Sequence, residues 1–364
     1  MNKIKAFLAR KGVVCSFRQY GVDALGAMAQ GLFCTLLVGT ILNTLGQQLH
    51  IGFLTAPVVS VGTVSYTVGG LASAMVGPGI AVAIGTALHC PPLVLFSLIP
   101  VGFAANAMGG AGGPLAVYAV TIIAAELGKL VSKETRIDIL VTPCVTVIAG
   151  IAVAQLIAAP IGTAARAVGL AIMWATELQP FFMGVLVSAL IGIALTLPIS
   201  SAAICAAFGL TGLAGGAAVA GCCAQMVGFA VMSFKENRWG GLVAQGVGTS
   251  MLQMPNILKN PRIWIPPTLA SMITGPLATC VFKLQMNGSP VSSGMGICGF
   301  VGQIGVYTGW VSDIAAGTKA AITPMDWIGL VLICFILPAV LSTLFCRVLE
   351  KRGWIREGDM KLDL

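Results

Sequence analysis

The chain has 364 residues, of which 57% are hydrophobic and only 9% are charged, whereas about a quarter of the residues of a soluble domain are charged. This composition excludes a soluble globular fold of this size. Each helical crossing of a bilayer needs about 20 mostly apolar residues and satisfies its own backbone hydrogen bonds. We therefore expect an all-α, polytopic integral membrane protein with about ten transmembrane helices and re-entrant segments, folded as one membrane domain over residues 1–364.

The formal net charge of +8 does not indicate a nucleic-acid partner, because most of the basic residues lie near the chain ends or in short loops. That distribution is typical of a protein that faces the anionic lipid of a bilayer. We interpret residues 1–19 as an amphipathic cytoplasmic segment and residues 349–364 as a cytoplasmic tail. The expected location is the bacterial plasma (inner) membrane, with both termini in the cytoplasm and an even number of crossings.

Metal and cofactor sites are not indicated by the sequence. The 11 cysteines include no Cys-x-x-Cys pair, and the two histidines are far apart. Cysteines scattered through apolar runs resemble small packing residues. We expect neither a metal nor a cofactor.

Ten apolar windows are long enough to be crossings. In chain order they are 22–46, 52–75, 79–101, 108–128, 137–160, 181–200, 214–233, 263–285, 292–310 and 326–347. An even count agrees with the basic residues at both ends of the chain.

A linker divides these windows into two groups. Residues 162–180 carry Arg166 and Glu177 on an otherwise apolar stretch, a pattern that suits a helix lying along the membrane interface. We expect a first helical half at 20–161 and a second at 181–348.

Two shorter apolar pieces, 201–213 and 240–258, remain outside the windows. Broken backbone at membrane depth is tolerated where protein or a water-filled cavity surrounds it, so we interpret these pieces as re-entrant segments. The alternative is that one of them is an ordinary tilted crossing.

The first candidate site contains Asn106, which starts a stretch with four glycines that ends at Pro114. Glycines there allow a helix break with backbone amides facing a substrate, although small residues also pack membrane helices tightly. His89 precedes Cys-Pro-Pro in a break between apolar pieces. It is either a proton-transfer group or a loop histidine without a role.

The second candidate site groups Lys235, Glu236 and Asn237 between apolar segments, followed by Asn256 in a proline-rich stretch. A charge inside a bilayer costs about 2.5 kcal/mol or more, so it persists there when it is paired, hydrated or functional. Amide side chains offer donors and acceptors suited to sugar hydroxyls. The alternative is a solvated interfacial loop with an aromatic anchor.

The third candidate site begins at Asn287 with a polar turn and continues through a glycine-rich stretch to Gln303. An unpaired amide within an apolar run is costly, so Gln303 should have a polar partner or line a wet cavity. The alternative is hydrogen bonding between packed helices.

These segments resemble the phosphotransferase-system enzyme IIC type 2 family, which includes membrane proteins named as regulators of the toxin perfringolysin O. The resemblance covers nearly the whole chain and rests mainly on 106–114, 235–241, 256–261 and 287–303. It implies a sugar-permease-like fold, a homodimer, and a sugar phosphorylated during passage by a cytoplasmic IIB partner. An active member would be a protein-N(pi)-phosphohistidine-sugar phosphotransferase acting with a separate IIB protein.

The chain departs from glucose-type members of the family, because it lacks their Gly-Ile-Thr-Glu segment. Our candidate for the sugar-hydroxyl acceptor or general base is therefore Glu236, chosen from local composition. The expected substrate-binding residues are Asn106, Lys235, Asn237, Asn256, Asn287, Gln303 and His89.

Three functions fit these observations. The first is a phosphotransferase-type permease that moves a sugar or similar small polar solute by alternating access. The second is a membrane-embedded solute sensor that regulates gene expression without transport. The third is an ion-coupled transporter of a small polar solute. A phosphorylation-dependent uptake assay separates the first from the other two.

Overall fold

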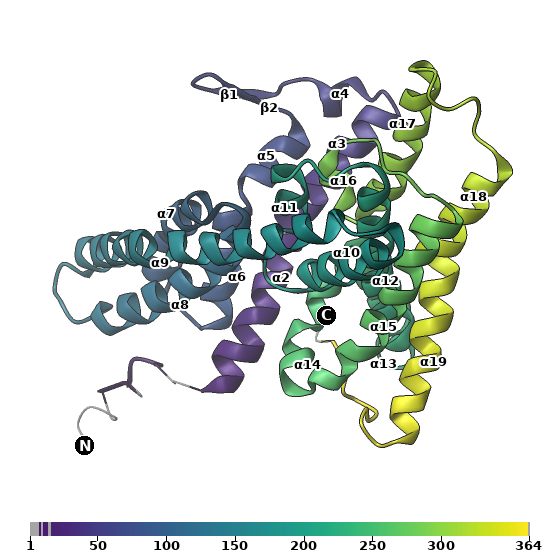
Figure 1. The fold of residues 1–364 in the computed structure, drawn as a ribbon. Helices are drawn as coiled ribbons and strands as arrows, with labels where there is room; N and C mark the ends of the chain where they lie inside the picture. Colours follow the sequence, from purple (N-terminus) through teal and green to yellow (C-terminus); the bar gives the residue numbers. More distant parts are fainter. Residues whose placement is uncertain (1–6, 9, 14–15, 363–364) are drawn as a thin grey trace. The chain divides into compact units, whose positions relative to one another are not determined.

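The computed structural model describes residues 7–8, 10–13 and 16–362 of the chain (Figure 1). This part is almost entirely helical, as the sequence predicted. The chain divides into two compact units, Met1–Ala164 and Ala165–Leu364.

The first unit is built from short and medium helices. These are α2 (Leu25–Leu32), α3 (Val38–Gln48), α4 (Gly52–Thr55), α5 (Val68–Ala74), α6 (Val76–Ala87), α7 (Pro92–Gly109), α8 (Gly113–Val131) and the start of α9 (Asp138–Thr176). Helices α7 and α8 fold back on each other and pack closely. A Cβ added to Gly128 of α8 would lie only 2.8 Å from the side chain of Val94 in α7. The turn between them uses Gly110, whose φ of 53° favours glycine.

A β-hairpin stands where the sequence predicted a second crossing. Strands β1 (Val59–Val61) and β2 (Val64–Tyr66) pair antiparallel around Gly62 and are largely exposed. The apolar window 52–75 was therefore wrong as a single crossing. Its β-branched residues on either side of a glycine favour a hairpin over a continuous helix.

The predicted window 79–101 was also wrong in its bounds, because it joins parts of two helices. Helix α6 ends before His89, and α7 begins at Pro92. Proline supplies no backbone N–H and restricts the residue before it, so the Pro91-Pro92 pair separates the helices.

The second unit contains the remaining helices. They are α10 (Pro180–Thr196), α11 (Ser201–Ala207), α12 (Gly212–Met232), α13 (Phe234–Val243), α14 (Met254–Lys259), α15 (Ile265–Pro276), α16 (Pro290–Ser293), α17 (Val301–Ala315), α18 (Pro324–Val331) and α19 (Leu337–Lys351). A π-helical turn joins α18 to α19, so residues 324–351 form one helical stretch.

Helix α12 is the core of this second unit. It packs against α10, α15 and α19, and nearly all of its residues are buried. Its glycines permit backbone contact, since a Cβ on Gly216 would lie 1.8 Å from the carbonyl oxygen of Leu284 and one on Gly221 1.9 Å from that of Ser188. Such close approach is typical of helices that pack inside membranes.

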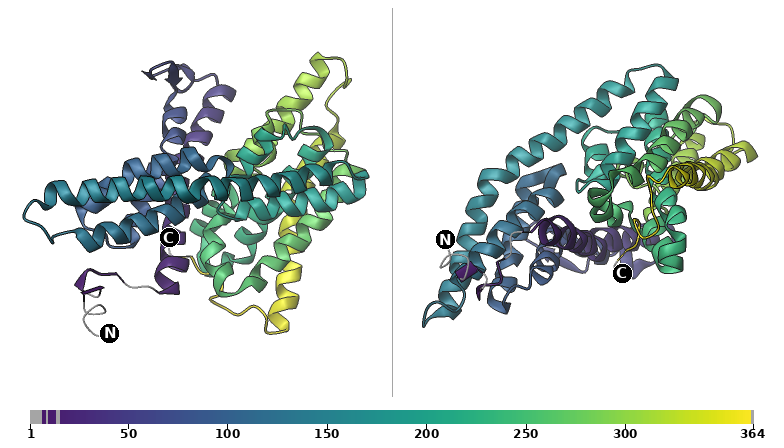
Figure 2. Two further views of the ribbon diagram at one scale, coloured as in Figure 1. Left: turned by 60° about the vertical axis from the view of Figure 1, so that its left-hand side comes forward. Right: turned by 90° about the horizontal axis from the view of Figure 1, so that it is seen from below.

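Helix α9 is continuous from Asp138 to Thr176 (Figure 2). It includes both the predicted fifth crossing and most of the predicted linker at 162–180. That the second part of this helix lies along the membrane interface stays a prediction.

Five stretches among the described residues are long and apolar enough to cross a membrane, and a sixth if the bent pair α5–α6 counts as one span. They are Arg18–Gln48, Pro92–Val131, Asp138–Thr176, Gly212–Met232 and Pro324–Lys351. The polytopic helical class is thus confirmed. The count is lower than ten because some predicted windows are broken or short: α10 has 17 residues, and α7 and α8 form one hairpin stretch.

Candidate functional site

A polar pocket of about 490 Å³ opens in the second unit, where α17 ends and α18 begins. Its volume is within the range of about 300–1,000 Å³ that is usual for small-molecule sites. The residues that line it are Phe282, Lys283, Gln285, Asn287, Trp310, Asp313, Thr318, Lys319 and Asp326.

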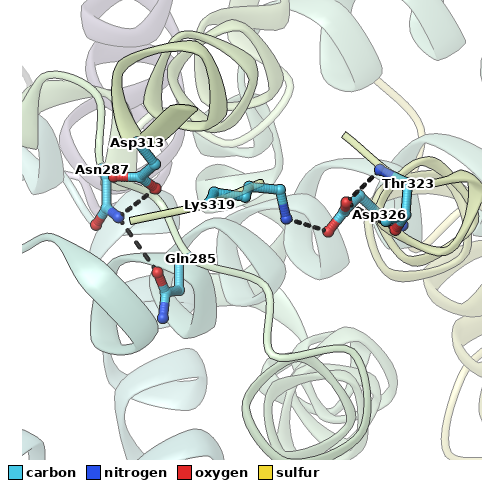
Figure 3. Close-up of polar contacts among 6 residues, drawn as sticks. All are labelled: Gln285, Asn287, Asp313, Lys319, Thr323 and Asp326. Carbon is cyan, nitrogen blue, oxygen red and sulfur yellow. Dashed lines mark hydrogen bonds and ion pairs between the residues drawn. The ribbon is translucent and has the colours of Figure 1, made fainter. Parts of the chain in front are cut away.

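Asn287 lines this pocket and hydrogen bonds to two other residues of its lining (Figure 3). Its Nδ2 donates to Asp313 Oδ2 at 2.8 Å and to Gln285 Oε1 at 3.3 Å. Its Oδ1 accepts a hydrogen bond from the backbone N–H of Gly212 at 3.2 Å. The asparagine thereby fixes the start of α12 against the end of α17 and orients two acceptor side chains toward the pocket.

An ion pair forms the other side of the pocket (Figure 3). Lys319 Nζ lies 2.9 Å from Asp326 Oδ1, and both side chains are mostly shielded from solvent. Asp326 Oδ2 accepts hydrogen bonds from the backbone N–H and the hydroxyl of Thr323. Thr323 and Asp326 form a capping box at the start of α18, which places the carboxylate at the pocket rim.

An aromatic wall completes the pocket. Trp310 is buried and meets Trp327 edge to face, with ring centroids 5.4 Å apart. Lys319 Nζ lies 5.9 Å from the centroid of the Trp310 ring. Carboxylates, amides and an aromatic ring around one cavity can bind the hydroxyls and the apolar faces of a sugar.

The second unit also contains four buried glutamines outside this pocket, one of them on α12. We call Gln303, Gln225, Gln245 and Gln253 the glutamine file; all four are buried. Gln303 Nε2 donates to Cys223 Sγ at 3.3 Å, whereas its Oε1 has no hydrogen-bond partner among the described residues. The predicted polar partner of Gln303 is therefore a weak one, a thiol.

Gln225 is fully hydrogen bonded. Gln225 Oε1 accepts from Trp264 Nε1 at 3.1 Å, and Gln225 Nε2 donates to Thr268 at 3.2 Å. Thr196 links this glutamine to Ser250. Such networks satisfy polar groups where water is excluded.

Two of these glutamines, Gln245 and Gln253, lie next to the C-terminal tail. Gln245 Nε2 donates to Ser233, and Gln253 Nε2 donates to Gln245 Oε1 and to the carbonyl oxygen of Met360, both at 2.9 Å. The second predicted site surrounds this point. Glu236, Asn237 and Asn256 all hydrogen bond to the backbone of residues 358–362.

The predicted site residues thus fall into separate groups. Asn287 lines the pocket, Gln303 belongs to the glutamine file, and Glu236, Asn237 and Asn256 bind the tail. Lys235 is exposed beside the tail-binding residues. Roles for all of them in solute binding stay predictions.

Asn106 and His89 belong to the first unit. Asn106 is half-buried in α7, and its Oδ1 would be 2.4 Å from a Cβ on Gly113, so the glycine makes room for it. His89 is exposed in the turn after α6, with a left-handed φ of 54°. Within residues 7–8, 10–13 and 16–362, no three His, Cys, Asp or Glu side chains cluster in a way that could hold a metal ion.

Sequence reasoning missed Trp310, Asp313, Lys319 and Asp326. The sequence did contain a signal for this site. The three charged residues lie close to tryptophans, at the turn between the last two apolar windows. Gln225, Gln245 and Gln253 were missed as well, since isolated amides in apolar runs give no spacing pattern.

The fold is that of a polytopic α-helical membrane protein, and its second unit contains a polar pocket. A family model described as phosphotransferase system, EIIC, matches residues 22–362, nearly the whole chain. The chain therefore belongs to the phosphotransferase-system EIIC family, the membrane permease components of sugar transport. Comparison with curated proteins and with solved structures gave no match.

Proposed function

We propose that this protein is the permease component of a sugar phosphotransferase system in the bacterial plasma membrane, and that the pocket between α17 and α18 is where its solute first binds. The observation that carries the proposal is the pairing of Asn287 with Asp313 and of Lys319 with Asp326 around one cavity. Carboxylates and amides held in place by each other bind hydroxyl groups without reorganising.

The side of entry follows from the proposed orientation. Residues 324–351 form one apolar stretch with the pocket at its start and basic residues Lys351 and Arg352 at its end. If that end is cytoplasmic, as basic residues favour, the pocket opens toward the outside. A solute would then be captured there and leave toward the cytoplasm, where a separate IIB protein would phosphorylate it. A homodimer and cytoplasmic termini are part of the proposal.

The test is uptake by purified protein in lipid vesicles. A panel of radiolabelled sugars is offered with and without a phosphorylated IIB protein. We expect uptake of at least one sugar, coupled to its phosphorylation, and loss of that uptake in Asp313→Asn. Ser312→Ala is the matched control, because this exposed hydroxyl bonds only to its own helix at Thr308.

Two results would redirect the proposal. Binding of a sugar without any uptake would favour the membrane-embedded sensor. Uptake that requires an ion gradient and leaves the sugar unphosphorylated would favour the ion-coupled transporter. Asp313→Asn uptake equal to that of the wild type would move the binding site away from this pocket.

A further inference from the structure

The C-terminal tail is bound in a groove of the second unit by side chains, not by a neighbouring strand or helix. We call this the tail groove; it consists of Glu236, Asn237, Gln253, Asn256 and Asn260. These residues come from α13, α14 and the segments beside α14. Their carboxylate and amide groups all hydrogen bond to one short segment, residues 354–362, which contains bends and turns.

The groove binds the tail mainly through the tail's backbone; the exception is Asn260, whose Nδ2 also donates to the Asp359 side chain at 2.7 Å. Glu236 Oε1 accepts from the N–H of Gly358 at 2.9 Å, and Oε2 accepts from the N–H of Met360 at 3.0 Å. Asn237 Oδ1 accepts from the N–H of Leu362 at 2.8 Å. The carboxylate makes no ion pair within the described part of the chain, so backbone N–H groups are its partners.

Donors of the groove hold the tail carbonyls in the same way. Asn237 Nδ2 and Gln253 Nε2 both donate to the carbonyl oxygen of Met360, at 2.8 and 2.9 Å. Asn256 Nδ2 donates to the carbonyl oxygen of Lys361 at 2.8 Å. Of the tail side chains in this stretch, Ile355 and Met360 are buried, whereas Lys361 is exposed.

This groove has the chemistry of a site for a polyhydroxylated molecule. Gln253 and Asn256 are buried amides, and without the tail their N–H groups would have to bind water or another ligand. The tail presents backbone N–H and C=O groups to these side chains, and the hydroxyls of a sugar could replace both, because each hydroxyl donates and accepts hydrogen bonds. Gln253 also donates to Gln245, so the tail contacts a hydrogen-bonded pair of buried glutamines.

We propose that residues 356–362 are a peptide latch: a reversible internal ligand that covers the amides of Asn237, Gln253 and Asn256 and must leave them before solute can bind there on its way through the protein. This inference rests on the proposed permease function. It assigns Glu236 and Asn237 the role of holding the latch, with the solute as its competitor for the same amides.

The first measurement is hydrogen exchange of the full-length protein in lipid nanodiscs. We expect the amides of residues 358–362 to be protected, and the double variant Glu236→Ala/Asn237→Ala to exchange them at least tenfold faster. Lys259→Ala is the matched control, because this side chain on α14 is exposed, and it should leave exchange unchanged. Equal exchange in the double variant and the wild type would overturn the latch contact.

The second measurement is uptake of the radiolabelled sugar panel by the same proteins in vesicles. We expect the double variant to take up sugar severalfold faster than the wild type. A synthetic peptide of residues 354–362, present both inside and outside the vesicles, should slow uptake by the double variant again. Faster exchange without faster uptake would overturn the latch and leave the permease function intact. No uptake by any protein, even with phosphorylated IIB, would overturn both proposals.

Hydrogen exchange elsewhere in the protein distinguishes release of the tail from general unfolding. Protection in α12 must stay at the wild-type level in the double variant, because α12 packs mainly against α10, α15 and α19. Uptake lower than that of the wild type with α12 still protected would show that tail binding supports transport, which also contradicts the latch.

Discussion

The amide nitrogen of Asn287 lies 2.8 Å from a carboxylate oxygen of Asp313, which joins two segments 26 residues apart in the chain. Asn287 is held on its other side by the backbone of Gly212. One asparagine therefore couples the beginning of the core helix α12 to the pocket wall.

Replacing Asn287 by leucine should separate these segments. Asp313 would lose its amide donor and Gly212 its side-chain acceptor, each a loss of about 1–2 kcal/mol. We expect a lower thermal midpoint in detergent and at least tenfold weaker sugar uptake in vesicles. Asn287→Asp keeps an acceptor for Gly212 but repels Asp313, so it should retain more stability than transport. Wild-type uptake in Asn287→Leu would contradict this role.

Trp310 should contribute strongly to both packing and binding. It is buried against Trp327, and truncation of a buried aromatic residue to alanine costs about 3–5 kcal/mol. We expect Trp310→Ala to fold poorly and Trp310→Phe to fold with reduced uptake. Trp239→Ala is the comparison, because Trp239 is 71% exposed and should change thermal stability little.

The glycines of α12 should not tolerate a methyl group. A Cβ on Gly216 or Gly221 would collide with a backbone oxygen at under 2 Å, and backbone cannot rotate away as a side chain can. We expect Gly221→Ala to lower the folded yield, with a cost at or above about 3 kcal/mol. Gly240→Ala is the control, since nothing lies within 4 Å of its added Cβ. Equal monodisperse yield of both variants would show that α12 can shift.

Two glutamines of the file should respond differently to leucine. Gln225→Leu leaves the indole N–H of Trp264 without an acceptor, at a cost of about 1–3 kcal/mol. Gln303→Leu removes an amide whose Oε1 already lacks a partner in the described chain, so stability should be unchanged or higher. If Gln303 serves solute passage, its leucine variant loses uptake while remaining stable. Thermal midpoints and uptake rates measured together separate the two effects.

The contact of Lys11 and Arg10 with Glu134 should depend on pH. A hydrogen bond from Lys11 and the charges of Lys11 and Arg10 lower the pKa of Glu134 below its usual value of 4.5. Stabilisation by this carboxylate is thus fully present above pH 4.5 and is lost as the pH falls through the lower folded pKa. Hydrogen exchange of residues 10–13, corrected for the intrinsic rate, should rise in that acidic window. Glu134→Gln should abolish the pH dependence.

Sequence patterns predicted the class of this protein well and its local breaks less well. Long apolar runs such as 214–233 correspond to real helices. A helix that is buried on all sides is apolar all round, so a continuous apolar run is enough to predict it. The hairpin at Val59–Tyr66 was missed, since a window average cannot distinguish β-branched strands from helix.

The candidate site could be predicted only in part. Asn287 and Gln303 stood out as polar residues in apolar surroundings, and the structure places both in the polar region of the second unit. Their partners Asp313 and Cys223 are distant in sequence, so spacing could not reveal them. Glu236 was a reasonable choice by charge alone, but its two backbone partners lie about 120 residues further along the chain.

Backbone contact along α12 has a mechanical consequence. Where Gly221 meets Ser188 and Gly216 meets Leu284, no side chain separates the two backbones, so there are no rotamers through which these elements could glide past one another. Helix α12 is thereby held directly against α10, and α10 against α15, where a Cβ on Gly275 would lie 2.1 Å from the carbonyl oxygen of Gly184. We therefore expect motion in this unit mainly at segments outside these three helices, such as residues 316–323 beside the pocket and the tail at 354–362.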